Sequence, residues 1–194
     1  MEFNLAIFAS GSGTNAENII KYFQHKPAVN INLIVTNNPK AFVIERAKQF
    51  NIECLVLTKE DWKDVNKVLN KLKPYNIDFI ILAGYLLRIP SPILNIYADK
   101  VINIHPALLP KYGGKGMYGD NVHKSVIANQ EKESGITIHY CNENYDEGNI
   151  IFQAKCSISP SDTYETLATK VHELEYKFFP IIIEKLLFNY NIER

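Results

Sequence analysis

The sequence has few cysteines and no excess of charge of either sign. Its three cysteines, Cys54, Cys141 and Cys156, are far apart and form no CxxC pair, which argues against a disulfide framework and a cysteine-based zinc site. Lys plus Arg (21) balances Asp plus Glu (21), so the chain lacks the overall basic field that is typical of proteins that bind nucleic-acid phosphates. These absences favour a protein of the reducing cytoplasm with no nucleic-acid partner.

The chain also lacks a long hydrophobic run. Residues 79–87 and 178–188 are short or interrupted, and the run 5–9 is too short for a signal-peptide core or a membrane span. The composition, 46% hydrophobic and 22% charged, is that of a globular protein. At this length a chain buries roughly 70% of its unfolded surface. We therefore expect a soluble, cytoplasmic protein with no membrane partner, built as a single domain over residues 1–194.

Short apolar runs alternate with helical patterns in the first half of the chain. Strands are predicted at 3–9, 31–36, 53–57, 79–83 and 101–104, with helices at 15–22, 41–51 and 62–72. This alternation is typical of an α/β fold with a doubly wound, mostly parallel sheet. In the second half, 135–141 and 150–157 predict a hairpin, which gives the sheet an antiparallel C-terminal extension.

Residues 163–187 predict a long closing helix. A kink or break is expected at Pro180, because proline removes a helix hydrogen bond. Ser161 or Asp162 is expected to cap this helix, with Glu165 three residues after Asp162.

A glycine-rich loop, Ser10-Gly11-Ser12-Gly13-Thr14-Asn15, follows the first predicted strand. Glycines allow close backbone approach, and Thr14 and Asn15 stand where free N–H groups and the helix dipole attract anions. The loop lacks the third glycine of a dinucleotide fingerprint and the Lys-Ser or Lys-Thr of a Walker loop. Two interpretations remain open, a phosphate site and a simple strand-to-helix turn.

The segment Asn103-Ile104-His105-Pro106 ends the fifth predicted strand. Strand alternation places Asn103 and His105 on the same side, at the sheet edge where ligands bind. Histidine exchanges protons near neutral pH, and an amide donates to a developing oxyanion, so the pair suits acyl transfer to an amine. The structural alternative is a histidine that caps a turn and a buried, hydrogen-bonded asparagine.

Asp146 lies in the loop between the two hairpin strands. A carboxylate beside His105 would fix the tautomer of the ring and favour its protonated form. His25, His123, His139 and His172 show no metal-ligand spacing and are interpreted as surface or structural residues, so no metal is expected.

Four segments, taken together and in this order, resemble the folate-dependent phosphoribosylglycinamide formyltransferase family. They are the loop at 10–15, Leu82-Ala83-Gly84-Tyr85, the stretch 103–110, and Gly135-Ile136-Thr137-Ile138-His139-Tyr140 leading to Asp146-Glu147-Gly148. The resemblance covers nearly the whole chain. It implies formyl transfer from 10-formyltetrahydrofolate, a cosubstrate, to glycinamide ribonucleotide, in a monomer or weak homodimer.

The resemblance also implies a role for each matching residue. It makes His105 the general acid, Asn103 the oxyanion donor and a folate contact, and Asp146 the group that raises the pKa of His105. It assigns the substrate phosphate to Gly13, Thr14 and Asn15, the glycinamide end to Glu175, and the folate pocket to Leu86, Leu87, Arg88 and Ile89. Departures from the family pattern are a longer loop at 115–119, Glu147 after Asp146, and the spacing around Arg88.

Three alternatives compete with this function. A formyltetrahydrofolate hydrolase shares the Asn-x-His segment but uses water as the acceptor. A formyltransferase acting on methionyl-tRNA would need a further nucleic-acid domain. A nucleotide-binding module without catalysis would give Asn103, His105 and Asp146 no reason to converge.

Overall fold

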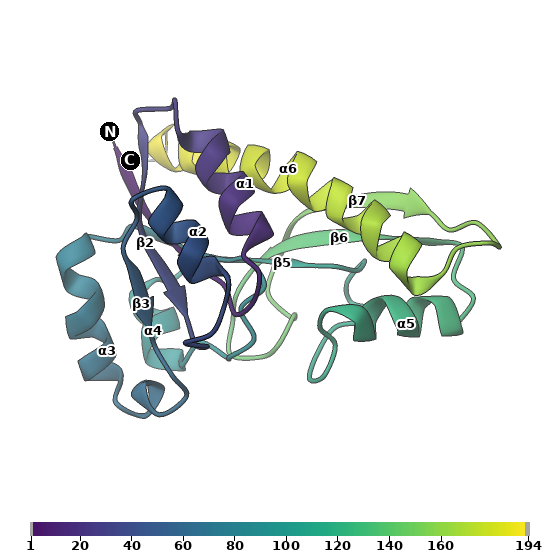
Figure 1. The fold of residues 1–194 in the computed structure, drawn as a ribbon, viewed down its shortest axis with the longest axis horizontal. Helices are drawn as coiled ribbons and strands as arrows, with labels where there is room; N and C mark the ends of the chain where they lie inside the picture. Colours follow the sequence, from purple (N-terminus) through teal and green to yellow (C-terminus); the bar gives the residue numbers. More distant parts are fainter. Residues whose placement is uncertain (1, 193–194) are drawn as a thin grey trace. The chain divides into compact units, whose positions relative to one another are not determined.

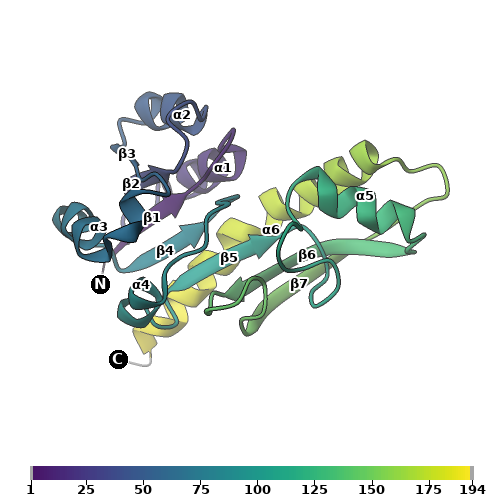
Figure 2. The ribbon, with the colours of Figure 1, turned by 90° about the horizontal axis from the view of Figure 1, so that it is seen from below.

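The computed structural model describes residues 2–192, which form a seven-stranded sheet with helices (Figures 1 and 2). The strand order is β3-β2-β1-β4-β5-β6-β7. The chain divides into two compact units, one up to Ile102 together with the chain from Leu186 onward, the other from Asn103 to Lys185. The α/β fold, with its mostly parallel sheet and antiparallel extension, is therefore confirmed. The single domain over residues 1–194 stays a prediction.

The first unit is built on four parallel strands. Parallel pairs join β1 to β2, β1 to β4, and β2 to β3, and the residues of β1 and β4 are almost all buried. Helices α1 and α2 contact β2, and α3 contacts α4. The strands of this unit are β1 (Phe3–Phe8), β2 (Val29–Thr36), β3 (Cys54–Val56) and β4 (Phe79–Leu82); its helices are α1 (Thr14–Phe23), α2 (Val43–Gln49), η1 (Asp61–Lys63), α3 (Val65–Leu72), η2 (Lys73–Tyr75) and α4 (Ser91–Ile96).

Strand β5 (Val101–His105) begins in the first unit and ends in the second. The second unit also holds α5 (Asp120–Ala128), β6 (Glu133–Tyr140), β7 (Ile150–Ser157) and most of α6 (Tyr164–Ile192). Figure 2 shows β6 and β7 side by side, and their antiparallel pairing runs from Glu133↔Ser157 to His139↔Ile150. The predicted hairpin is thus confirmed.

Two details of the predicted helices are wrong. The helix expected at 62–72 is two helices, η1 and α3, because the Asp64 carboxylate accepts the Lys67 N–H at 3.0 Å and caps a new helix start. Pro180 lies inside α6, and the helix continues through it to Ile192, so the break is wrong and the kink stays a prediction. The neighbouring positions Phe179 and Ile183 are fully buried, and packing of this kind offsets a lost helix hydrogen bond.

The cap of α6 also differs from the prediction. Thr163 Oγ1 accepts the Thr166 N–H at 3.4 Å, and the Thr163 N–H donates to Thr166 Oγ1 at 2.9 Å. This reciprocal pair is a capping box with threonine at both positions. Asp162 instead accepts the Ser159 N–H and pairs with Lys170. Helices α4 and α5 were not predicted, because few of their residues are buried and the apolar pattern is short.

Candidate active site

The glycine-rich loop joins β1 to α1 in the first unit. Gly13 is the N-cap residue of α1 and has a left-handed backbone, with φ of 72°. A Cβ atom at this position would lie 2.4 Å from Cγ2 of Val43, a distance that real contacts do not reach. Gly11 has open space around it. The loop therefore requires glycine at residue 13 for both conformation and space.

Thr14 and Asn15 are the first two residues of α1, as predicted. The first N–H groups of a helix have no partner within the helix and, with the helix dipole, attract anions. Arg46 stabilises the loop, because its Nε donates to the Ser12 carbonyl at 2.7 Å and its guanidinium pairs with Glu17 on α1. The conformation of the loop is thus fixed by contacts with α1 and Arg46, and its binding of a phosphate stays a prediction.

Ser10 connects this loop to the segment after β4. Its hydroxyl donates to Asn37 Oδ1 at 2.5 Å and accepts the Leu86 N–H at 2.8 Å, while its own N–H donates to the Gly84 carbonyl. Leu86 and Arg88 are exposed, whereas Ile89 is buried in the core. Of the predicted folate residues, Leu86 and Arg88 are therefore open to a ligand and Ile89 packs in the core, and the folate contacts of all of them stay a prediction.

In the second unit, Asn103 and His105 are brought together with Asp146, as the sequence predicts. Asp146 Oδ2 lies 3.4 Å from His105 Nδ1, and Asp146 Oδ1 accepts from Asn103 Nδ2 at 3.5 Å. His105 is buried and Asp146 is nearly so. An amide, an imidazole and a carboxylate thus converge from one strand and one loop.

His139, which was interpreted as a structural residue, belongs to the same cluster. Its Nδ1–H donates to the Tyr140 carbonyl at 2.9 Å, so its Nε2 is the acceptor and receives the Asn103 Nδ2–H at 3.0 Å. The signal was available in the sequence. Thr137 and His139 alternate on one face of β6, and Thr137 also faces inward, donating to the Ala107 carbonyl at 2.7 Å.

The ring of His105 has a partner at each nitrogen. A carbonyl oxygen only accepts, so the 2.8 Å contact with the Tyr112 carbonyl means that His105 Nε2 carries the hydrogen. Burial lowers the pKa of His105, and this outweighs the opposite effect of the Asp146 carboxylate. Asp146 thus raises the pKa of His105, as the resemblance implies, while burial takes the pKa below its ordinary value.

Asp146 is held from the other side by a glycine loop. The Gly114 N–H donates to Asp146 Oδ2 at 2.9 Å, and a Cβ at Gly113 would lie 3.1 Å from the Asp146 Cβ. Burial acts to raise the pKa of Asp146, but the polar groups around the carboxylate, among them the Gly114 N–H, lower it below its ordinary value. Asp146 therefore stays ionised beside His105 at neutral pH.

Two further polar residues are buried in this unit. Glu175, on α6, is only 6% exposed, and its Oε2 lies 4.0 Å from Nε2 of the exposed His172. His123, on α5, is 2% exposed, and burial lowers its pKa to about 4. His123 is thus a neutral, buried ring at physiological pH, in agreement with its interpretation as structural.

The cysteines show no sign of nucleophilic chemistry. All three are free thiols, and burial raises the pKa of Cys54 to about 11 and that of Cys141 to about 12. Within residues 2–192, no group of three metal-ligating side chains is placed to hold a metal ion. In the same part of the chain, every helix is too short or too polar to cross a membrane.

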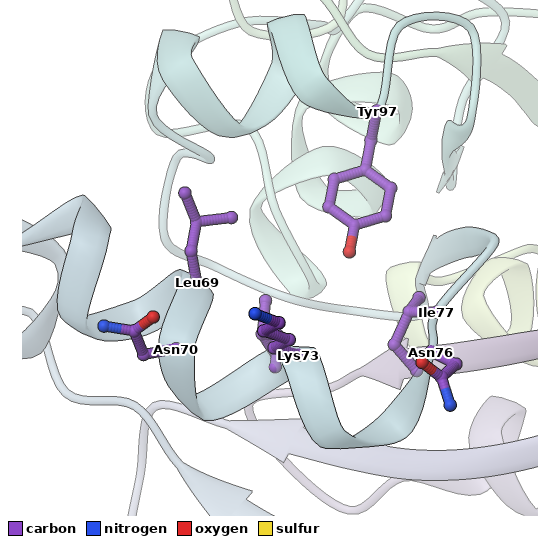
Figure 3. Close-up of a pocket in the computed structure, with 7 residues that line it drawn as sticks. Leu69, Asn70, Lys73, Asn76, Ile77 and Tyr97 are labelled. Carbon is purple, nitrogen blue, oxygen red and sulfur yellow. The ribbon is translucent and has the colours of Figure 1, made fainter.

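A pocket of about 330 Å³ lies in the first unit, beside α3, η2 and the end of α4 (Figure 3). Figure 3 shows the Tyr97 hydroxyl pointing toward the side of the pocket formed by Lys73 and Ile77. None of the predicted site residues lines it. The pocket is therefore separate from the candidate site residues.

Comparison with known proteins agrees with this arrangement. The model of the formyl transferase family matches residues 3–183. A phosphoribosylglycinamide formyltransferase of Bacillus subtilis is 35% identical, covering 94% of this chain and 93% of its own. A chloroplastic relative of the same name from Arabidopsis thaliana is 38% identical over 92% of this chain, which spans 63% of its length. The crystal structure of a phosphoribosylglycinamide formyltransferase from Bacillus halodurans has a TM-score of 0.86 at 38% identity, covering 95% of each chain.

The chain belongs to the formyl transferase family. Within that family, the relatives that it resembles over most of its length are phosphoribosylglycinamide formyltransferases.

Proposed function

We propose that this protein transfers the formyl group of 10-formyltetrahydrofolate to the amine of glycinamide ribonucleotide, a step of purine biosynthesis. The observation that carries the proposal is the convergence of Asn103, His105 and Asp146 in a formyl transferase chain. The products are formylglycinamide ribonucleotide and tetrahydrofolate. No metal takes part in this proposal, since the amine attacks directly.

The reaction needs one proton to move from the amine to the folate. The amine nitrogen attacks the formyl carbon, which forms a C–N bond and leaves a negative charge on the former carbonyl oxygen. The lowered pKa of His105 keeps the ring neutral at rest, so His105 Nδ1 accepts the amine proton. The same proton then passes to folate N10 as the bond between that nitrogen and the formyl carbon breaks. His105 is therefore a base first and the predicted acid second.

Asn103 and Asp146 stabilise the charges that this transfer creates. Asn103 Nδ2 has two hydrogens. One is held by His139 at 3.0 Å, and the other, whose contact with Asp146 Oδ1 is long at 3.5 Å, is the one that donates to the oxyanion. Asp146 is ionised and 3.4 Å from His105 Nδ1, so it stabilises the ring when it is protonated. Each side chain thus acts most strongly on the intermediate, which is the requirement for catalysis.

The remaining predicted residues bind the two substrates. Gly13, Thr14 and Asn15 hold the phosphate of the ribonucleotide, supported by the left-handed Gly13 and the start of α1. Glu175 contacts the glycinamide end, and its burial supports a role that needs a fixed carboxylate. The exposed Leu86 and Arg88, with Leu87 and Asn103, contact the folate.

The proposed setting is the cytoplasm, with the protein a monomer or weak homodimer acting on small molecules alone. Three free thiols support a reducing compartment. Sedimentation at several concentrations tests the oligomeric state.

The test is an assay of purified protein with 10-formyltetrahydrofolate and glycinamide ribonucleotide. We expect formylglycinamide ribonucleotide and tetrahydrofolate in equal amounts. Formate in place of the formylated product would favour a hydrolase and overturn the proposal. Binding of the ribonucleotide without turnover of either substrate would favour a non-catalytic module. His105→Gln serves as the control, because it keeps a polar side chain but cannot carry the proton.

A further inference from the structure

The loop that follows β5 contacts both members of the His105–Asp146 pair. The Tyr112 carbonyl accepts the His105 Nε2–H at 2.8 Å, and two residues later the Gly114 N–H donates to Asp146 Oδ2 at 2.9 Å. The main chain of this short segment therefore fixes both the imidazole and the carboxylate.

The contact with Tyr112 determines which nitrogen of His105 exchanges protons. Because the carbonyl holds the hydrogen on Nε2, the basic nitrogen of the neutral ring is Nδ1, which faces Asp146. Without this carbonyl, the hydrogen of the neutral ring would move to Nδ1, where the carboxylate oxygen 3.4 Å away accepts it. Nδ1 would then have no lone pair for the amine proton. The position of the Tyr112 carbonyl thus selects the reactive tautomer.

Tyr112 holds this position in an unfavourable backbone conformation. Its φ is 58°, in the left-handed region that residues other than glycine rarely adopt. Such a conformation persists where neighbouring contacts hold it, and here the contact lies at the far end of the side chain. The Tyr112 hydroxyl donates to Glu131 Oε1 at 2.9 Å, and Lys111 Nζ donates to the same oxygen at 2.9 Å.

Glu131 comes from a different part of the chain, three residues after the end of α5. Its side chain is 25% exposed, and contacts with Lys111 and Tyr112 lower its pKa, so the carboxylate is charged at neutral pH. Within residues 2–192, its hydrogen bonds and ion pair go to Lys111 and Tyr112 and not to His105, Asn103 or Asp146. Its influence on them therefore runs through Tyr112.

We propose that Glu131, through its hydrogen bond from the Tyr112 hydroxyl, is a positioning residue that holds the Tyr112 carbonyl against His105 and so keeps Nδ1 as the proton-exchanging nitrogen. The inference rests on the proposed formyl transfer for its kinetic consequence. Its structural part, the tautomer of His105, is independent of any activity.

Three other titratable residues affect the pKa of His105 or lie near it, and none of them is substituted in the test. Asp146 raises the pKa of the ring and His139 lowers it, while His123 lies close enough for its own pKa to be lowered by His105. The substitutions below leave these three residues unchanged. A change in the tautomer or in the pH profile of His105 is therefore attributable to the Tyr112 contact.

The first measurement is nitrogen NMR of the histidine rings in the wild-type protein. His105 is assigned among the five histidines by the signal lost in His105→Gln. We expect a neutral His105 ring with its hydrogen on Nε2 in the wild type, and a mixture of tautomers in Tyr112→Phe and Glu131→Ala. A wild-type ring with its hydrogen on Nδ1 overturns the proposal, whether or not any variant folds.

The second measurement is the pH profile of kcat and KM for formyl transfer. Tyr112→Phe and Glu131→Ala are expected to lower kcat roughly three- to tenfold, as for the loss of one hydrogen bond, with KM changed less than about twofold. Glu131→Gln keeps an acceptor for the hydroxyl and should restore most of the loss. Lys111→Met is the matched control, because it removes the other donor to Glu131 and leaves the Tyr112 bond in place.

The outcomes separate the two proposals. An inactive wild type with the expected tautomer overturns formyl transfer and leaves the positioning role standing. If the wild type is active, and if Tyr112→Phe and Glu131→Ala have the same His105 tautomer, kcat and pH profile as the wild type, the positioning role alone is overturned. An equal loss in Lys111→Met would also overturn it, since Glu131 would then act only as a surface anchor.

Discussion

The carboxylate of Asp146 faces Nδ1 of His105 at 3.4 Å, while the opposite nitrogen of the same ring donates to the Tyr112 carbonyl at 2.8 Å. This arrangement puts the exchangeable proton of the protonated ring next to a negative charge. Burial lowers the pKa of His105, and Asp146 limits that fall. The pair is therefore suited to hold a proton briefly, between an amine that loses it and a folate nitrogen that gains it.

Asp146→Asn should slow turnover and shift the pH profile in a known direction. The variant keeps the size of the side chain and removes its charge, so the pKa of His105 falls further below its ordinary value. Because the neutral ring is the active form at rest, the limb of kcat that rises with pH should move to lower pH. We expect kcat to fall about 10²- to 10⁴-fold, since the protonated ring loses its partner.

Initial rates between about pH 5 and pH 8 measure this effect. The limb belongs to His105 if it disappears in His105→Gln. A limb that moves to higher pH in Asp146→Asn would show that His105 must be protonated before the amine attacks. In that case the order of base and acid roles given above is wrong.

Asn103→Ala should cost more than the removal of its partner His139. Loss of one oxyanion donor costs about 2.7–4 kcal/mol of transition-state stabilisation, or roughly 10²- to 10³-fold in kcat. His139→Leu removes the group that orients the Asn103 amide at 3.0 Å and that also lies 3.6 Å from Asp146 Oδ1, and for the lost hydrogen bond we expect a loss of about 0.5–1.5 kcal/mol.

A double variant provides the control for this prediction. If His139 acts through Asn103, the Asn103→Ala, His139→Leu protein should be no slower than Asn103→Ala alone. Additive losses in single-turnover rates would mean that His139 has a separate role toward the substrate.

Gly13→Ala should weaken the binding of the ribonucleotide phosphate. The added Cβ meets Val43 at 2.4 Å, and the backbone at φ of 72° disfavours any other residue. The left-handed conformation alone costs about 1–2 kcal/mol for a non-glycine residue. We expect a lower free energy of unfolding and a KM for glycinamide ribonucleotide raised more than the KM for the folate.

Gly11→Ala is the matched control, because residue 11 has open space around it. It should leave the KM for the ribonucleotide nearly unchanged. Gly84→Ala is a second control, since residue 84 has a positive φ of 77° with no atom in the way. If all three variants raise that KM equally, the loop has no particular role in phosphate binding.

The sequence pattern was sufficient for most of the fold. Buried strands such as β1 and β4 are short, continuous apolar runs, and these are visible without any tertiary information. The predicted helix boundaries are wrong where tertiary contacts determine whether a helix starts or continues. Asp64 starts a new helix through one side-chain hydrogen bond, and α6 continues through Pro180 among buried neighbours.

Most residues of the candidate site could be predicted from the sequence, but the net direction of the pKa of His105 could not. Asn103 and His105 are two residues apart on one strand, so their common direction follows from strand geometry. The alternation along β6 places His139 on the same face as Thr137, but its contact with Asn103 also needs β6 to lie beside β5, which the alternation does not give. The net direction of the pKa of His105 depends on burial, which no local pattern of residues reports.

Buried His123 should make the stability of the protein depend on pH. Its pKa is about 4 in the folded state and near its ordinary 6.5 when the chain is unfolded. The unfolded state therefore binds the proton more tightly, and this contribution is complete above about pH 6.5 and is lost as the pH falls toward 4. We expect the free energy of unfolding to drop by roughly 1.4 kcal/mol per pH unit in this window from His123 alone.

Chemical denaturation at about pH 7 and pH 5 measures this slope, and His123→Leu should reduce it. His25→Asn is the control, because His25 is exposed. The lowered pKa of His105 adds a slope of the same sign, so a smaller dependence remains in His123→Leu. Asp146 does not contribute to this slope. Its pKa lies below 3.8, so the carboxyl stays ionised between about pH 5 and pH 7. A slope that His123→Leu leaves unchanged would show that the ring of His123 gains a proton in the folded state as readily as in the unfolded one.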